Sequence, residues 1–302
     1  MYQVESPVLF LVFNRPNESR SVFEAIRKVK PKKFYIAGDG PRKGHLNDIE
    51  NCAKTREIVN EIDWPCQVVL LMRNENLGCG LAVSQALNWF FDNEPEGIVL
   101  EDDCLPNDDF FRFCDSMLQK YRHDGRIGHI SGTNMHDNIK RGNATYFFSR
   151  LTGIWGWASW ARVWKDYDYH LSKLDSAIGA NFLDDLIPNR RIQKSLLRDF
   201  INTKAGNNDT WDYQYLFMHL ISHRMSVFPN SNLISNIGFN SNGTHTLSDS
   251  EYSAVKTKPL DDDITHPDIY LPSKSADIYT LEKAIPARPY AYFRKLKRIL
   301  FK

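Results

Sequence analysis

Four short apolar runs alternate with helix-like segments over the first 121 residues, and this alternation restricts the fold more than any other feature. The apolar runs cover residues 7–13, 33–37, 67–72 and 97–100, and helical patterns follow at 19–28, 47–62, 81–91 and 108–121. Continuous apolar runs are typical of strands that are covered on both faces. Short connections between alternating strands and helices favour parallel strands. The sequence therefore predicts an α/β fold with a mostly parallel sheet flanked by helices.

The second half of the chain is less regular. Short strands are expected at 128–131, 146–150, 225–229 and 233–237, with helices at 183–203, interrupted by Pro188, and at 211–222. No composition change marks a boundary until about residue 250, where the chain becomes polar and rich in proline. We therefore expect one domain over residues 1–250 and a C-terminal extension over 251–302.

Charge and cysteine content exclude several classes of protein. The 38 basic and 37 acidic residues give a net charge of +1, which offers no reason to expect a nucleic-acid binder. Five dispersed cysteines without a CxxC or Cys/His spacing are typical of reduced thiols in a cytosolic protein. No run approaches 18 apolar residues, so no transmembrane helix is expected, and the first apolar run predicts a strand rather than a signal peptide.

Polar side chains follow three of the predicted strands. Glu101, Asp102 and Asp103 directly follow the strand at 97–100, while Asn14 with Arg15 and then Asp39 follow the first two strands. Ligands of open α/β sheets bind at the carboxyl ends of the strands. Three adjacent carboxylates are unfavourable unless a cation offsets them, and oxygen ligands suit Mg²⁺ or Mn²⁺. The alternative is a solvated acidic turn that caps the next helix.

The acidic segment VLEDDCLPNDDFF resembles the Asp-X-Asp segment of the GT-A glycosyltransferases, here in a Glu-Asp-Asp form. The nearest likeness is to the N-acetylglucosaminyltransferase I type and to related bacterial sugar transferases. It extends in order through LFLVFNRP, YIAGDGPR, NLGCGLAVSQALNWFF, GWASWARVW, TWDYQY and SNIGFNSNGTHT, over about residues 7 to 246. The resemblance implies a GT-A-type Rossmann-like sheet, an irregular acceptor-side half, a nucleotide-sugar donor, a divalent metal ion and an inverting transfer.

The resemblance also implies roles for individual residues. Those expected near the nucleotide are Asn14, Arg15, Asp39, Gly78, Glu101 and Asp102. Asp103 is the expected metal ligand, with His245 as a second one. An isolated loop histidine such as His245 is otherwise usually just solvated.

The acidic segment that carries the catalytic base contains two carboxylates. Asp212 is the expected base, which would take a proton from the acceptor hydroxyl. Asp209 is the fallback, because the register of the segment decides which carboxylate matches the family, and it could instead cap the following helix.

Two further segments have competing interpretations. The sequence Gly78-Cys79-Gly80 imitates part of a dinucleotide fingerprint, but the third glycine is replaced by Val83, so a tight turn near the sugar-nucleotide or a plain turn is favoured. Aromatic faces suit the C–H face of a sugar. Trp155, Trp157 and Trp211 are therefore candidates for the acceptor or sugar site, although some tryptophans in this region must belong to the core.

The C-terminal residues 288–302 contain six basic residues and no acidic one. A helix beginning at Tyr290 would place Phe293, Leu296 and Leu300 on one face, a pattern typical of helices that lie on anionic membranes. The alternatives are a solvated tail or a helix packed on the domain. This pattern predicts a cytoplasmic protein that can associate peripherally with the inner membrane face.

These observations together predict a metal-dependent inverting glycosyltransferase. The resemblance implies a UDP-sugar as the donor, with UDP-GlcNAc as a candidate, and the expected acceptor is a glycan or a lipid-linked sugar. A nucleotidyltransferase that makes nucleotide-sugars is an alternative, but Asn14-Arg15-Pro16 is not the glycine-rich loop such enzymes have after the first strand. A non-catalytic carbohydrate-binding protein would leave Glu101, Asp102 and Asp103 without a role.

Overall fold

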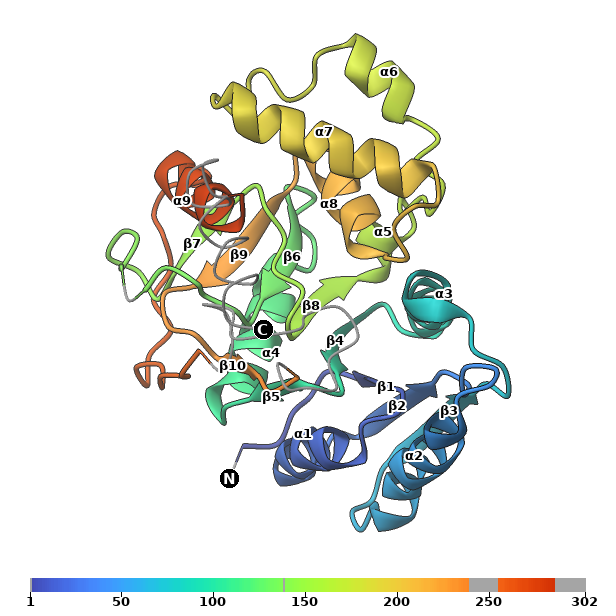
Figure 1. The fold of residues 1–302 in the computed structure, drawn as a ribbon. Coiled ribbons are helices and arrows are strands. Elements are labelled where there is room, and N and C mark those ends of the chain that lie inside the picture. Colours follow the sequence, from blue (N-terminus) through green and yellow to red (C-terminus); the bar gives the residue numbers. More distant parts are fainter. Residues whose placement is uncertain (1, 138, 239–254, 286–302) are drawn as a thin grey trace, which may run out of the picture.

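The computed structural model describes residues 2–137, 139–238 and 255–285 and has an eight-stranded sheet at its centre (Figure 1). The strand order is β3-β2-β1-β4-β8-β6-β9-β7. The bounds are β1 Val8–Val12, β2 Lys33–Gly38, β3 Gln67–Met72, β4 Glu96–Glu101, β6 Ile127–Ser131, β7 Tyr146–Ser149, β8 Trp157–Trp160 and β9 Met225–Pro229. The short strands β5 (Cys104–Pro106) and β10 (Ile234–Asn236) form a separate antiparallel pair.

The helices connect and cover these strands. Their bounds are α1 Pro16–Val29, α2 Leu46–Arg56, the 3₁₀ helix η1 Glu57–Glu61, α3 Gly78–Asn93, α4 Asp109–Tyr121, α5 Ala161–Trp164, α6 Leu174–Gly179, α7 Arg190–Lys204, α8 Asp212–Ile221 and α9 Lys274–Ala284. In the described ranges, every helix is too short or too polar to cross a membrane.

The first half of the sheet is parallel and the second half is mixed. Strands β3, β2, β1 and β4 run parallel, whereas β8 is antiparallel to both β4 and β6. Beyond β8, β9 is parallel to β6, and β7 is antiparallel to β9. The expected α/β class, with a largely parallel sheet between helices, is confirmed.

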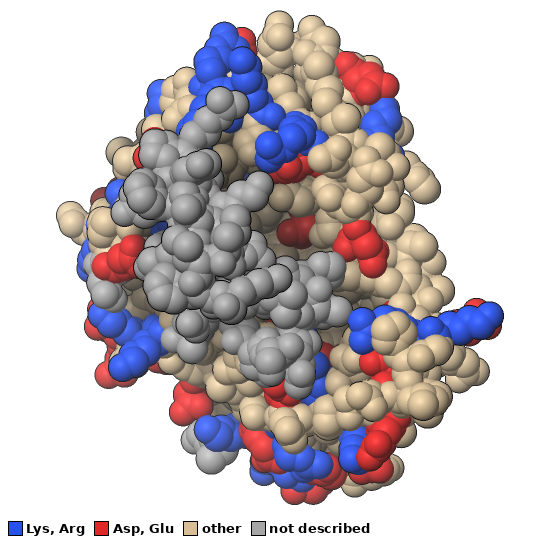
Figure 2. Space-filling model, in the orientation of Figure 1, with Lys and Arg blue, Asp and Glu red and all other residues tan. Residues whose placement is uncertain are grey.

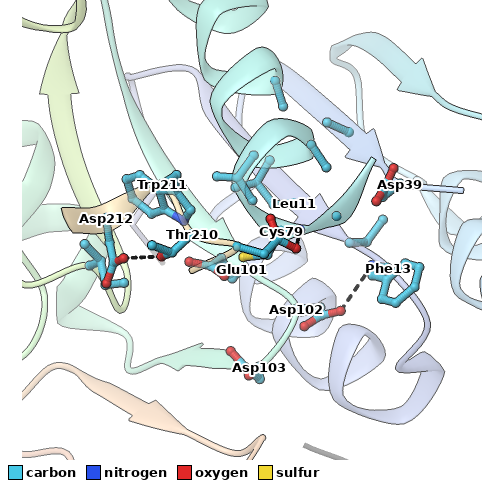
Figure 3. Close-up of a pocket in the computed structure, with 18 of the residues that line it drawn as sticks. Leu11, Phe13, Asp39, Cys79, Glu101, Asp102, Asp103, Thr210, Trp211 and Asp212 are labelled. Atoms are coloured by element: carbon cyan, nitrogen blue, oxygen red, sulfur yellow. Dashed lines mark hydrogen bonds between the residues drawn. The ribbon is translucent and has the colours of Figure 1, made fainter. Parts of the chain in front are cut away.

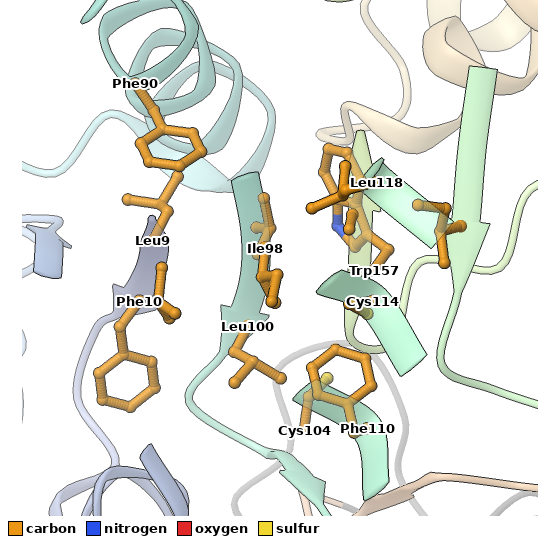
Figure 4. Close-up of a cluster of buried hydrophobic side chains, with 14 of the residues drawn as sticks. Leu9, Phe10, Phe90, Ile98, Leu100, Cys104, Phe110, Cys114, Leu118 and Trp157 are labelled. Atoms are coloured by element: carbon orange, nitrogen blue, oxygen red, sulfur yellow. The ribbon is translucent and has the colours of Figure 1, made fainter. Parts of the chain in front are cut away.

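Alternate residues of the buried strands face two different helical layers. Phe10, Ile98 and Leu100 share the face that α1 and α4 cover, and Figure 4 shows Leu100 near Phe110 of α4. Leu9 and Val99 share the opposite face, which α3 covers. Since Glu101 lies two residues after Val99 in β4, its side chain belongs to this second face.

The region before α8 differs from the sequence-based expectation. A helix was expected over 183–203, but α7 begins at Arg190, because the side chain of Asn189 accepts hydrogen bonds from the backbone N–H groups of Arg191 and Ile192. Helices α6, α7 and α8 bury a second apolar cluster that includes Leu174, Leu196 and Phe217. This cluster supports α8, whose first residue is Asp212.

The described part of the expected C-terminal extension packs against the edge strand β7. The backbone N–H of Ser273 donates to the carbonyl of Phe148 over 2.7 Å, and Ser149 Oγ donates to Asp277 Oδ1 over 2.6 Å. Residues 255–285 therefore contact the body formed by residues 2–238, and the expected boundary near residue 250 stays a prediction. His245 and the basic segment 288–302 lie outside the described residues.

Candidate active site

A cavity of about 610 Å³ opens at the carboxyl ends of β1, β2 and β4. Figure 3 shows Phe13 and Asp39 at one end, Trp211 and Asp212 at the other, and Cys79 and Glu101 between them. Figure 2 shows acidic side chains at a hollow in this face of the molecule. The charged lining residues are Arg15, Asp39, Arg42, Arg73, Glu101, Asp102, Asp103, Asp209 and Asp212. Six carboxylates against three guanidinium groups give the cavity an excess of negative charge.

Arg15 lies between two carboxylates of the acidic cluster. Its Nη1 atom donates to Asp102 Oδ1 over 3.1 Å and to Asp103 Oδ2 over 2.6 Å. Asp102 Oδ2 also accepts from the backbone N–H of Phe13 over 3.2 Å, which ties the end of β4 to the end of β1. The structure thus brings together Arg15, Asp102 and Asp103 as the sequence predicted, through a contact between β1 and β4.

Glu101 lacks such compensation. Burial, reinforced by the charges of Asp103, Asp102 and Asp212, raises the pKa of Glu101 to about 8. Burial also raises the pKa of Asp102, although Arg15 opposes this effect. Burial is the main cause of the raised pKa of Glu101, and the neighbouring Arg15 opposes it only in part.

The donor set of this cluster fits a hard divalent cation. Carboxylate oxygens are the preferred ligands of Mg²⁺ and Mn²⁺, and the guanidinium of Arg15 lies where positive charge is required. Among the described residues, no three His, Cys, Asp or Glu side chains are grouped to hold a metal ion by themselves. In proteins, Mg²⁺ is usually bound through one or two carboxylates together with substrate phosphates.

Asp39 lies at the opposite end of the cavity and is 8% exposed. Its carboxylate accepts from the backbone N–H of Leu77 over 3.1 Å and from Asn76 Nδ2 over 2.8 Å. Burial raises the pKa of Asp39, and these hydrogen bonds oppose the shift. Asp39 therefore fixes the turn before α3 while it lines the cavity.

Asp209 and Asp212 have different surroundings. Asp209 accepts hydrogen bonds from the backbone N–H groups of Cys79 and Gly80 at the start of α3. It caps a helix, as one interpretation expected, but α3 rather than the helix that follows it in sequence. Asp212 Oδ1 accepts from Thr210 Oγ1 and from the backbone N–H of Tyr213. Within the described part of the chain, no hydrogen bond involves Asp212 Oδ2.

Cys79 lies between these acidic groups. Burial and the charges of Glu101, Asp209 and Asp212 raise the pKa of its thiol. The group therefore stays protonated at neutral pH, and the arrangement does not favour a thiolate nucleophile.

The three candidate tryptophans have different surroundings in the structure: two line the cavity and one lies in the core. Trp155 and Trp211 line the cavity, although Trp211 is only 2% exposed. Trp157 is 0% exposed, and its ring packs on those of Trp211 and Tyr215 in the core. The expected contact of Trp157 with a sugar is therefore wrong, because β8 directs this side chain under α3 and α8.

Two other expected residues do not join the cavity. Asn14 is absent from its lining, and its side-chain amide donates to Asp48 Oδ1 over 2.7 Å instead. His245 lies outside the described residues. Gly78 does line the cavity, at the first turn of α3.

Sequence reasoning missed two basic residues of the lining. Arg73 directly follows β3, so the rule that pointed to Asp39 could have found it. Arg42 lies in the connection after β2, where its guanidinium is paired with Asp48 over 2.6 Å. Arg73 places a positive charge at the Asp39 end of the cavity.

No protein-family model matches the chain, and no curated protein matches it. Solved structures show partial likeness. TarS 1–349 of S. aureus has 11% identity and a TM-score of 0.39, over 55% of this chain and 49% of that one. The mannosyltransferase PcManGT of Pyrobaculum calidifontis, in complex with GDP-Man and Mn²⁺, has 14% identity and a TM-score of 0.32, over 53% and 45%.

HddC of Yersinia pseudotuberculosis, complexed with GMP-PN, has 13% identity and a TM-score of 0.31, over 54% of this chain and 80% of that one. The aligned part of this chain thus spans about half the length of TarS 1–349 and of PcManGT. TM-scores below 0.5 are too low to carry a conclusion about this chain.

Proposed function

We propose that this chain is a GT-A-type glycosyltransferase that moves a sugar from a nucleotide-sugar to a hydroxyl group of an acceptor. The single observation that carries the proposal is the position of two acidic groups in one cavity. Glu101, Asp102 and Asp103 lie at the end of β4, and Asp212 lies across from them at the start of α8. A donor diphosphate at the first group would bring its sugar toward the second.

The proposed donor is a UDP-sugar, with UDP-GlcNAc as a candidate. The cavity volume of about 610 Å³ lies within the range of about 300–1,000 Å³ that is usual for small-ligand sites. The nucleoside would lie at the end lined by Phe13, Asp39 and Arg73. The diphosphate would lie near Arg15, whose guanidinium can bind phosphate oxygens as it binds carboxylates.

The acidic cluster would hold the metal ion. Asp103, with Asp102 beside it, would bind Mn²⁺ or Mg²⁺, and the bound cation would offset the charge that develops on the leaving diphosphate. His245 remains a proposed second ligand. Arg15, now paired with both aspartates, would then be available to the diphosphate.

Asp212 is the proposed base of an inverting transfer. It lines the cavity, its Oδ1 atom is held by Thr210 and Tyr213, and its Oδ2 atom has no hydrogen bond in the described ranges. Oδ2 would take the proton from the acceptor hydroxyl as the new oxygen–carbon bond forms and the bond to the diphosphate breaks. Trp155 and Trp211 would contact the sugar or the acceptor, which we propose is a glycan or a lipid-linked sugar.

Thermal-shift measurements test this function. UDP-GlcNAc, UDP-glucose, UDP-galactose and GDP-mannose would each be added with Mn²⁺ or with EDTA. A ligand present at a hundred times its Kd stabilises the native state by about 2.7 kcal/mol. We expect a UDP-sugar to raise the Tm in Mn²⁺ and not in EDTA. If none does so, but a nucleoside triphosphate with a sugar phosphate does, the protein is a nucleotidyltransferase instead.

A further inference from the structure

The carboxylate of Asp209 reaches a helix that lies 130 residues earlier in the chain. Oδ2 accepts from the backbone N–H of Cys79 over 2.9 Å, and Oδ1 accepts from that of Gly80 over 2.7 Å. These N–H groups belong to the first turn of α3 and have no partner within the helix. The side chain of Asp209, from the segment before α8, therefore caps the N-terminus of α3.

The first turn of α3 is shaped to receive this side chain. Gly78 has a φ of +78°, and a Cβ atom there would lie 2.5 Å from Asp209 Oδ2. At Gly80, a Cβ atom would lie 2.8 Å from the carbonyl oxygen of Thr210. Both glycines thus allow the backbone of α3 to approach residues 209–210 more closely than any other residue type would permit.

The segment anchored in this way leads directly to Asp212. Thr210, the neighbour of Asp209, donates its hydroxyl to Asp212 Oδ1. The carbonyl oxygen of Thr210 accepts from Gln214 Nε2 over 2.9 Å, and the carbonyl oxygen of Trp211 accepts from Tyr167 Oη over 3.1 Å. The direction of the Asp212 carboxylate therefore depends on where Thr210 lies, and Asp209 holds Thr210 against α3.

We propose that Asp209 is a positioning residue, which acts through Thr210 to hold the carboxylate of Asp212 toward the cavity. This inference rests on the proposed function, in which Asp212 is the base. Both oxygens of Asp209 accept backbone hydrogen bonds, whereas Asp212 Oδ2 accepts none within the described residues, and this difference favours Asp212 as the base. The same bonds occupy the N–H groups of Cys79 and Gly80, which are therefore not the groups that bind the donor phosphates.

Three variants separate positioning from folding. Asp209→Ala removes both hydrogen bonds, and Asp209→Asn keeps one acceptor oxygen. Gly80→Ala disturbs the same contact from the side of α3, although alanine favours a helix interior over glycine. Asn189→Ala is the matched control, because Asn189 also accepts from two backbone N–H groups at a helix start, in α7.

The kinetic measurement is the release of UDP from UDP-GlcNAc in Mn²⁺, with UDP affinity measured by calorimetry. A small misplacement of a catalytic group costs on the order of a hundredfold in rate. We expect Asp209→Ala and Gly80→Ala to lower kcat roughly tenfold to a hundredfold with unchanged UDP affinity. The kcat of Asp209→Asn should lie between those of Asp209→Ala and the wild type, and Asn189→Ala should leave kcat unchanged.

Amide hydrogen exchange gives a readout that needs no activity. In Asp209→Ala, exchange should become faster at residues 78–82 and at 208–212, and in Asn189→Ala it should be unchanged in both segments. An unchanged exchange in Asp209→Ala overturns the anchor, and so does a kcat equal to that of the wild type. If the wild type releases no UDP while exchange changes as expected, the proposed function fails and the anchor stands.

Discussion

Asp102 and Asp103 share the guanidinium of Arg15, while Glu101 has a pKa raised to about 8. This difference shows how the cavity tolerates adjacent carboxylates. At neutral pH, Glu101 keeps its proton for most of the time, so the repulsion within the cluster is reduced. A bound divalent cation would favour the charged form of all three groups. We infer that the cluster is organised to accept positive charge from outside the chain.

The substitution Asp212→Asn tests the proposed base. The amide has nearly the same shape as the carboxylate but cannot accept the proton of the acceptor hydroxyl. Turnover of UDP-GlcNAc should fall at least about a hundredfold, the usual scale for the loss of a general base, while the affinity for UDP is retained. Turnover close to that of the wild type would place the base elsewhere, and loss of UDP binding would assign Asp212 to the donor site.

The sequence predicted the acidic cluster but not the partner of Asp209. Glu101 ends β4 after the apolar residues 98–100, and Asp102 and Asp103 follow directly, so their place at the carboxyl end of the strand depends only on local pattern. The contacts of Asp209 with Cys79 and Gly80 join residues about 130 positions apart. No periodicity reports such a contact, because it forms only where the segment before α8 meets the first turn of α3 in the folded chain.

At the scale of elements, β8 explains why the tryptophans differ. The segment Trp157–Trp160 was expected as part of an aromatic-rich region, whereas it forms an antiparallel strand between β4 and β6. Its pairing joins strands that are distant in sequence, and a short aromatic run does not specify which neighbours it will have. Of the two nearby candidates, strand geometry buries Trp157 and leaves Trp155 at the cavity.

Substitution of Trp157 should mainly lower stability, whereas substitution of Trp155 should mainly weaken ligand binding. Trp157→Ala should lower the free energy of unfolding by about 3–5 kcal/mol, the range for large-to-small changes of buried aromatics. Trp155→Ala should weaken the binding of UDP-GlcNAc more than that of UDP, with a smaller loss of stability. Denaturant unfolding and calorimetry measure these effects. A Trp157→Ala variant as stable as the wild type would contradict its place in the core.

Helix α8 also carries a histidine that predicts a dependence of stability on pH. His219 is buried, its ring nitrogens have no hydrogen-bond partner within the described residues, and its ring lies 4.7 Å from that of Tyr215. Burial, with the nearby His129 and Arg224, holds the pKa of His219 well below its usual value. The unfolded chain therefore takes up a proton below about pH 6.5 that the folded chain does not.

The substitution His219→Leu isolates this effect. Because the lowered pKa destabilises the wild type as pH falls below about 6.5, the variant should gain stability relative to it there. The difference should grow by about 1.4 kcal/mol for each pH unit. Denaturant unfolding of both proteins between pH 7.5 and pH 5 measures it. A difference that stays constant over this range would show that His219 has the same pKa in the folded and in the unfolded chain.

At the scale of the whole molecule, residues 255–285 complete the body that carries the cavity. Leu260 donates its backbone N–H to Asp109 at the start of α4, and Lys283 pairs with Asp137. A boundary at residue 250 was expected because composition changes there. Composition reports the polarity of a segment and not where it packs, so the attachment to β7 could not be read from it.

The basic residues 288–302 lie outside the described residues, and their role remains a prediction. Each basic side chain near an anionic membrane surface contributes about 1 kcal/mol of binding free energy. At physiological ionic strength the screening length is about 8 Å, so added salt weakens this attraction. The full chain should sediment with anionic vesicles at low salt, and a chain ending at residue 287 should do so much less. Equal sedimentation of the two chains would contradict a role for this segment and leave the site assignment unchanged.

The most direct test of the account is the binding of UDP measured by calorimetry, in Mn²⁺ and in EDTA, for the wild type and Asp103→Ala. Glu50→Ala is the control, because Glu50 is a surface carboxylate paired with Lys54 on α2. The account predicts that Mn²⁺ strengthens UDP binding at least about tenfold in the wild type and in Glu50→Ala. It predicts no such gain in Asp103→Ala, whose fold is retained. An equal gain in all three proteins would contradict the proposed metal and nucleotide site.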